Sequence, residues 1–150
     1  MGKAANSSIS LKQIHVTDNF WNKYVHLVKD VIIPYQWDIL NDKLEDVETS
    51  HCIENFKIAA GEKEGEFQGA VFQDTDVAKW LEAVGFVLNY ERDEKLEELA
   101  DETIELIGRA QQPDGYLNTY FTIKEPDGRW SNLMEGHELY TAGHMIEAAV

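Results

Sequence analysis

Side chains able to bind a ligand gather in two short stretches, FQDTD at residues 72–76 and the segment around His137. Each stretch lies at the start of an apolar helical pattern. Together they offer the aromatic ring of Phe72, polar groups on Gln73 and Asp74, and an imidazole that can donate and accept hydrogen bonds. Such a mixture suits a sugar, whose hydroxyl groups need polar partners and whose C–H face packs on aromatic rings. These residues therefore predict a sugar-binding surface.

Each of these side chains also has a purely structural explanation. Asp74 or Thr75 can cap the helix that follows. His137 can be a capping or packing histidine, and Glu138 beside it favours the helix dipole without any further role. A place beside a helix N-terminus disfavours the charged form of His137 and leaves a neutral imidazole. At the level of the sequence both explanations stay open.

The residue types of several other active sites are missing or wrongly spaced. HELYTAGH at 137–144 is not the HExxH zinc motif, because its second histidine falls seven residues after the first. No pair of carboxylates can be identified that would flank a glycosidic bond. Cys52, the single cysteine, cannot form an internal disulfide or a cysteine zinc site alone. No motif in the chain therefore identifies a catalytic or metal-binding residue. A single cysteine, no apolar run that could cross a bilayer and no signal segment at the start together predict a cytoplasmic location.

Composition limits the class of protein and its partners. The 150 residues suit one domain with a real core, and 43% of them are hydrophobic, which is typical of a globular chain. Thirteen basic residues against 28 acidic ones give a net charge of −15, which argues against a nucleic-acid partner. No apolar run is long enough to cross a bilayer. The acidity itself is explained by solubility.

Three long segments carry helical patterns of apolar residues. Residues 75–90 are apolar on most sides, as in a helix surrounded by neighbours. Residues 93–112 have one apolar stripe and an acidic remainder, which we interpret as a solvated face. Residues 134–150 are again apolar over a broad face. This inner–outer–inner order predicts an all-α fold whose helical hairpins begin an (α/α)6 toroid.

The segments before the first long helix are shorter. Residues 1–10 are expected to be disordered, and the alternation of residues 11–18 predicts a short strand. Asp18 should then cap a helix that Pro34 ends or kinks. Another helical pattern spans residues 51–62.

A loop rich in aromatic residues separates the second and third long helices. Pro-Asp-Gly turns at 113–115 and 126–128 predict a small hairpin over residues 116–130, with Tyr116 returning to the core. Inner helices of a toroid point the same way, so their N-terminal ends share one rim. We expect part of this loop to lie at that rim.

The last helical pattern has no stop signal. It reaches Val150 without a glycine, a basic last turn or a proline. Three helical hairpins cannot close a toroid, so we expect residues 11–150 to be the N-terminal part of a longer, truncated domain.

Several segments, in their order and spacing, resemble the N-terminal part of glycoside hydrolase family 127, the β-L-arabinofuranosidases. The similarity runs from about residue 12 to the end. It is carried by VIIPYQWDILND (31–42), AAGEKEGEFQGAVFQDTDVAKWLE (59–82), IGRAQQPDGYLNTYF (107–121) and GHELYTAGHMIEAAV (136–150).

The resemblance implies an (α/α)6 catalytic barrel followed by β-sandwich domains. It implies retaining hydrolysis of terminal β-L-arabinofuranosyl groups of oligosaccharides by a cysteine thiolate held on zinc, with a glutamate as acid/base. The matching positions for these groups lie beyond this chain, and Cys52 does not match a zinc ligand. His137 matches a family histidine that contacts the sugar. Phe72, Gln73 and Asp74 match a family segment at the barrel rim.

Two other functions compete with this one. The first is a stand-alone helical interaction module whose apolar faces bind a partner chain. Self-association is expected instead of a truncated chain, whose apolar surface would be exposed. The second is another sugar-active enzyme on the same fold. Cysteines and a glutamate in chain beyond Val150 would favour the arabinofuranosidase.

Overall fold

The structure is a computed structural model that describes residues 9–150, and within this range it contains helices and no β-strand. The predicted disorder of residues 1–10 therefore falls largely outside the described residues. No helix in the described part of the chain is long and apolar enough to cross a membrane. The α-helices are α1 (Asn19–Leu27), α2 (Ile33–Leu40), α3 (Cys52–Ala59), α4 (Asp74–Tyr90), α5 (Glu94–Ala110), α6 (Thr119–Ile123), α7 (Leu133–Gly136) and α8 (Glu138–Ala149). Short helical turns are η1 (Leu11–Gln13), η2 (Val28–Ile32) and η3 (Pro126–Gly128).

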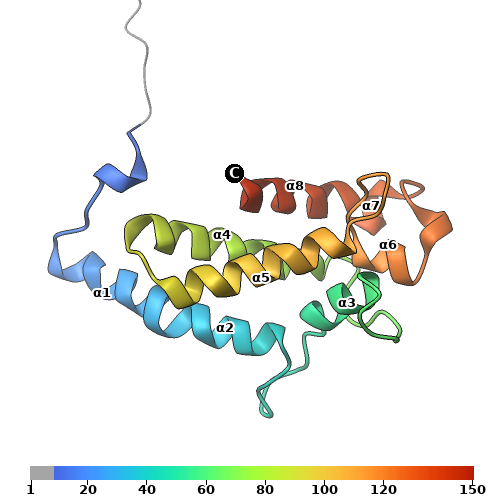
Figure 1. Cartoon of the computed structure of the whole chain (residues 1–150), viewed down its shortest axis with the longest axis horizontal. Coiled ribbons are helices and arrows are strands. Elements are labelled where there is room, and N and C mark those ends of the chain that lie inside the picture. Colours follow the sequence, from blue (N-terminus) through green and yellow to red (C-terminus); the bar gives the residue numbers. More distant parts are fainter. Residues whose placement is uncertain (1–8) are drawn as a thin grey trace, which may run out of the picture.

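Helix α4 is the centre of the arrangement. It packs against α8, α2 and α5. Figure 1 shows α4 and α8 side by side and running in the same direction, while α5 returns in the opposite direction along α4. The predicted inner position of residues 75–90 is confirmed, because Val77 and Ala78 are fully buried and Trp80 and Val84 nearly so.

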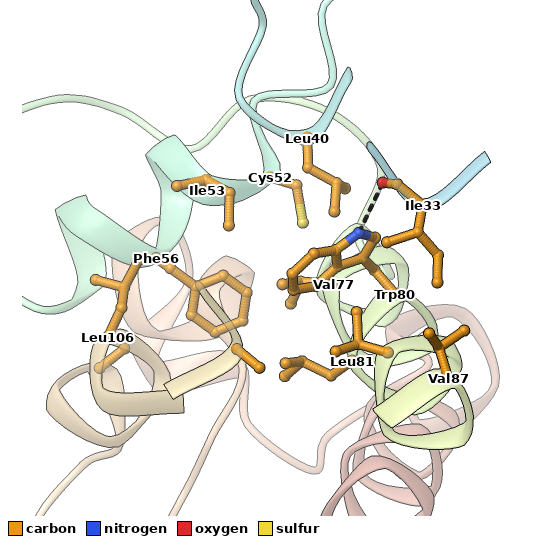
Figure 2. Packing of buried hydrophobic residues seen from close by; sticks show 13 residues of the cluster. Ile33, Leu40, Cys52, Ile53, Phe56, Val77, Trp80, Leu81, Val87 and Leu106 are labelled. Carbon is orange, nitrogen blue, oxygen red and sulfur yellow. Dashed lines mark hydrogen bonds between the residues drawn. The ribbon is translucent and has the colours of Figure 1, made fainter. Parts of the chain in front are cut away.

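The core lies between α2, α3, α4 and α5. Figure 2 shows Phe56 and Cys52 from α3 facing Val77 and Trp80 of α4. The indole Nε1 of Trp80 donates a hydrogen bond to the main-chain oxygen of Ile33 at 3.1 Å. A buried indole N–H needs such a partner, so this hydrogen bond fixes the Trp80 ring of α4 against α2.

The long N-terminal helical segment starts as predicted but passes through its proline. Asp18 Oδ1 accepts hydrogen bonds from the backbone N–H groups of Phe20 and Trp21, at 3.0 and 2.8 Å, which confirms the predicted cap. Pro34 does not end the helix. The chain widens into the π-helical turn η2 and continues as α2, because proline has no N–H to donate and its ring displaces the carbonyl one turn earlier.

Helix α5 forms the outer layer. Asp93 caps it by accepting from Leu96 N at 3.2 Å. Thr103, Leu106 and Ala110 are buried, whereas the acidic side chains of the opposite face are exposed. The interpretation of the acidic run as a solvated face is therefore confirmed.

Two of the smaller predicted elements are wrong. Residues 11–18 form the turn η1 and extended chain instead of a strand, and Leu11 and Ile14 remain exposed because no neighbouring strand pairs with them. Residues 116–130 form α6 and η3 instead of a hairpin. Asn118 starts α6 by accepting from Phe121 N at 3.1 Å, so the chain coils where a hairpin would extend.

Candidate functional site

The N-terminal ends of α4 and α8 lie together at one end of the molecule, beside α6 and α7 (Figure 1). Phe72, just before α4, and His137, just before α8, have ring centroids 5.2 Å apart. Phe72 is 42% exposed, so this pair is accessible to solvent. Two of the four predicted sugar-binding residues are therefore neighbours at a shared rim.

His137 interrupts the predicted helix over residues 134–150. Its backbone is left-handed, with φ 52° and ψ 21°, and it separates α7 from α8. The imidazole Nδ1 donates a hydrogen bond to the main-chain oxygen of Glu135 at 2.7 Å. The ring also meets that of Tyr140, with centroids 6.2 Å apart and planes at 79°. This half-buried imidazole has one nitrogen bound to the main chain, and within residues 9–150 no hydrogen bond is formed by the other.

Glu138, the first residue of α8, holds the aromatic loop in place. It is 2% exposed, and its carboxylate accepts hydrogen bonds from Tyr116 Oη and, at 2.7 Å, from the backbone N–H of Trp130. Burial, together with the bond to Glu138, raises the pKa of Tyr116 far above its ordinary value. The guanidinium of Arg129 covers the Tyr116 ring at 4.1 Å. The loop after the first Pro-Asp-Gly turn is thus bound to the start of α8.

Asp74 has a partner other than the one predicted. It does not cap α4, which begins without a side-chain cap. Instead both carboxylate oxygens accept from Thr119, one from its backbone N–H at 2.7 Å and one from its hydroxyl. Burial raises the pKa of the Asp74 carboxyl to about 6, and the two bonds from Thr119 act in the opposite direction. With 2% exposure, Asp74 lies beneath the rim and anchors α6 to α4.

Gln73 lies at the edge of a groove of about 820 Å³, with a mixed polar and apolar lining, between α2, the segment around Ser50 and α4. Its Nε2 donates to Asp76 Oδ2 at 2.9 Å and to Ser50 Oγ at 3.3 Å. Burial raises the pKa of Asp76, while the charge of Lys79 lowers it. The side chain of Gln73 is therefore held in place by its neighbours at the edge of an open groove.

Lys79 connects the two inner helices on the same side. Its ammonium group donates to the hydroxyl of Tyr140 at 3.1 Å and to Thr75 Oγ1 at 3.3 Å. Lys79, Tyr140 and His137 thus form one set of neighbouring side chains. Gln73 and Asp76 form a second set, which lines the same groove as Lys79. Such a surface can hydrogen-bond several hydroxyl groups at once.

The described residues do not form a zinc site. Within residues 9–150 no three His, Cys, Asp or Glu side chains converge to hold a metal ion. Cys52 is fully buried in α3, and its thiol donates to the main-chain oxygen of Gln73 at 3.3 Å. Burial, helped by the charge of Asp74, raises the pKa of this thiol well above its ordinary value. A neutral, enclosed thiol is a poor metal ligand.

A family model for the GH127 catalytic domain, described as β-L-arabinofuranosidase, matches residues 13–150. The chain belongs to glycoside hydrolase family 127. It is 41% identical over 153 residues to a non-reducing end β-L-arabinofuranosidase of Bifidobacterium longum subsp. longum, covering 91% of this chain and 23% of that protein. The expected family resemblance is confirmed.

Two solved structures share the fold of this GH127 chain. A GH127 β-L-arabinofuranosidase from Geobacillus stearothermophilus T6 superposes with a TM-score of 0.90 at 64% identity, over 91% of this chain and 22% of that one. A GH127 β-arabinofuranosidase superposes with a TM-score of 0.82 at 32% identity, over 94% and 23% of the two chains. The chain thus spans about a quarter of the length of these relatives.

The contacts that organise the site were missed from the sequence. The pairs Asp74–Thr119 and Glu138–Tyr116 join residues 45 and 22 positions apart. Pro-Asp-Gly occurs on both sides of the aromatic loop and indicates that the loop is structured. It does not predict which carboxylates bind the loop.

Proposed function

We propose that residues 11–150 form the first part of the catalytic barrel of a retaining β-L-arabinofuranosidase acting on terminal β-L-arabinofuranosyl groups. The observation that carries this proposal is the family match over residues 13–150, and the contact between the rings of Phe72 and His137 supports it. Two of the relatives named above are β-L-arabinofuranosidases. The nucleophile and acid/base then belong to chain beyond Val150.

The direction of the helices supports an (α/α)6 barrel. Helices α4 and α8 are parallel neighbours, and α5 returns outside α4, which is the repeating unit of a two-layer toroid (Figure 1). In such a barrel the N-terminal ends of inner helices surround one opening. The dipoles of these helices bring their positive ends to that opening, where hydroxyl and carboxylate oxygens are favoured.

Phe72, Gln73 and His137 are the proposed sugar contacts. The exposed side chain of Phe72 can pack against the C–H face of the furanose, while His137 can hydrogen-bond a hydroxyl. Gln73 already donates to Asp76 and Ser50, so its contact with a hydroxyl would be an accepted hydrogen bond at the amide oxygen. The predicted contact of Asp74 requires its bonds to Thr119 to open. We therefore assign Asp74 a positioning role, in which it holds α6 beneath the sugar.

Zinc is proposed for the complete enzyme only, from the family resemblance. The described residues offer no converging ligand set, so no step is assigned to the metal here. When bound, zinc would ionise a cysteine thiol and so make it a nucleophile. In this proposal the chain contributes part of the barrel wall and the contacts to the sugar.

The experiment is an assay of the complete protein on p-nitrophenyl β-L-arabinofuranoside, with the α-L-arabinofuranoside and β-D-galactoside as controls. We expect release from the β-L-arabinofuranoside alone, and a loss of activity on chelation that zinc restores. Phe72→Ala should raise KM, because it removes packing against the sugar. Equal cleavage of a control glycoside would favour another sugar-active enzyme on this fold.

A second candidate function, an interaction module, is supported by exposed apolar surface. On α1 the rings of Phe20, Trp21 and Tyr24 are in mutual contact and all about half exposed or more. Between α5 and α8 lies an apolar groove of about 560 Å³ beside the exposed side chains of Ile104 and Ile146. Sedimentation of the 150-residue chain tests this candidate: a monomer at all concentrations is expected of a stand-alone module, whereas concentration-dependent self-association is expected of an incomplete barrel and counts against the module.

A further inference from the structure

We infer that the apolar groove between α5 and α8 binds one further helix of the complete protein, the first helix beyond Val150, which lies antiparallel to α8. This inference rests on the proposed function, because it takes residues 11–150 as the first part of a longer barrel. It adds which surface of this segment the following chain covers, in which direction that chain runs, and which end of it meets the aromatic loop.

The groove has the length and the lining of a helix-binding surface. Its volume is about 560 Å³, and its lining residues reach from Glu138 to Ala149, the two ends of α8. At 1.5 Å per residue this is a span of about 17 Å, or about three helical turns. The exposed side chains of Ile104 and Ile146 lie on its two walls, and the small side chain of Ala142 lets a neighbouring backbone approach closely. One apolar stripe of an amphipathic helix fits such a groove.

The position of α5 indicates where the next outer helix packs. Helix α5 follows the inner helix α4 after a short break, returns along it, and also packs against α3, the helix before α4 (Figure 1). A helix that repeats this relation one step along the chain packs against α8, the next inner helix, and beside α5, the previous outer helix. The groove between α5 and α8 is the place where it meets both.

The end of the groove at the aromatic loop matches the C-terminal end of such a helix. Because α8 begins at this loop and ends at Ala149, a helix that returns along α8 ends at the loop. Asn118 lines the groove there, and it is 3% exposed. Its Oδ1 accepts from Phe121 N, whereas its Nδ2 has no hydrogen-bond partner among the described residues. The last carbonyl oxygens of a helix need donors, and Asn118 Nδ2 is a donor without an acceptor.

Charge favours a segment of the same protein over a second copy. The chain has a net charge of −15, and Glu97 and Asp101 are exposed on α5 within two turns of Ile104. Two copies joined through this groove would bring two strongly acidic chains together, and like charges oppose association. The relatives provide the length that the inference needs, since this chain covers 23% and 22% of two of them.

The test is photo-crosslinking within the complete protein, with p-benzoylphenylalanine placed singly at Ile146 or at Trp130. Both side chains line the groove and are 64% and 52% exposed in the described segment. Ile146 is near the end of α8, and Trp130, whose N–H donates to Glu138, is near its start. Glu98, an exposed residue of α5 outside the groove, is the control position. Photo-methionine in place of Met145 probes the same groove with a side chain of nearly native size, and it decides the outcome if the larger probe disturbs folding.

We expect both groove probes to crosslink to one helix beyond Val150, with the partner of Ile146 earlier in the sequence than the partner of Trp130. The two partners should lie roughly eight positions apart, because Ile146 is about that many residues from the start of α8 and both helices rise 1.5 Å per residue. The probe at Glu98 should form no crosslink to that helix.

A product of doubled mass would show that a second copy fills the groove and would overturn the inference. Crosslinks to another segment, crosslinks in the opposite order, or none outside residues 9–150 would overturn it equally. Cleavage of p-nitrophenyl β-L-arabinofuranoside by the same samples measures the proposed function separately. Cleavage together with any of these crosslink patterns rejects the inference alone, whereas the expected crosslinks without cleavage reject the proposed activity alone.

Discussion

Removal of the Glu138 carboxylate should loosen the aromatic loop far more than removal of its charge alone. Glu138 is buried and accepts two hydrogen bonds, from Tyr116 Oη and Trp130 N. A hydrogen bond to a charged group contributes about 1.5–3 kcal/mol. Glu138→Ala loses both bonds and should therefore lower the free energy of opening of this loop by about 3 kcal/mol or more.

Glu138→Gln should have a smaller effect, since an amide oxygen can still accept from Trp130 N and the amide N–H can donate to the tyrosine oxygen. We expect a loss of about 1 kcal/mol, because both remaining bonds are neutral. Tyr116→Phe should lie between the two variants. In the double variant Tyr116→Phe/Glu138→Ala the two losses should add to less than their sum, because the residues share one bond.

Hydrogen exchange measured by mass spectrometry is a suitable assay, because exchange of the Trp130 amide reports the local opening directly. A loss of 3 kcal/mol corresponds to roughly hundredfold faster exchange, at about 1.4 kcal/mol for each factor of ten. Asp127→Ala is the control, since this exposed acidic residue of η3 forms no hydrogen bond or ion pair within residues 9–150. Unchanged exchange over residues 113–132 in Glu138→Ala would refute the reasoning. Equal acceleration in the Ala and Gln variants would also refute it, by showing that charge alone matters.

Three further outcomes are expected. Because folding raises the pKa of Asp74 from 3.8 to about 6, the folded chain binds more protons than the unfolded chain between these pH values, and its stability should fall as pH rises from about 4 to 6. Asp74→Asn should flatten the dependence of Tm on pH in that window. An unchanged slope would show that another group is responsible. Cys52, which is fully buried and has a raised pKa, should react with a disulfide reagent at neutral pH only after denaturant is added; rapid labelling of the native chain would contradict its placement. Trp80→Phe should lower the free energy of unfolding by about 1–3 kcal/mol, because it removes the indole N–H that donates to the carbonyl of Ile33. A midpoint of urea unfolding equal to that of wild type would show that this hydrogen bond does not stabilise the fold.

The long helices were predictable because their signals are local. Five apolar positions at helical spacing and a long uninterrupted pattern define α4 to within a residue of its observed start. The acidic face of α5 follows from the same periodicity, since charged side chains at those positions cannot be buried without partners. The shared rim could also be predicted, because parallel inner helices must place their N-terminal ends together.

The contacts at the rim were not predictable, because they depend on partners that are distant in the chain. A carboxylate at the start of a helix fits a cap as well as it fits a bond to Thr119, and only the packing of α6 on α3 and α4 decides between them. The left-handed backbone of His137 could not be predicted, because the helical pattern of apolar residues continues on both sides of it. Residues 11–18 show the converse, since alternation alone does not form a strand without a neighbour to pair with.

The distance in sequence between Asp74 and Thr119 has a consequence for how the chain folds during synthesis. The ribosome adds roughly 5–20 residues per second, and these partners are separated by 45 positions. The N-terminal end of α4 is therefore made about 2–9 s before the residue that completes its burial. During this interval the carboxylate can only be satisfied by water, so the first turn of α4 should stay hydrated and open. The rim is consequently among the last parts of this segment to become native, and nascent chains stalled before Thr119 should expose it to chaperones.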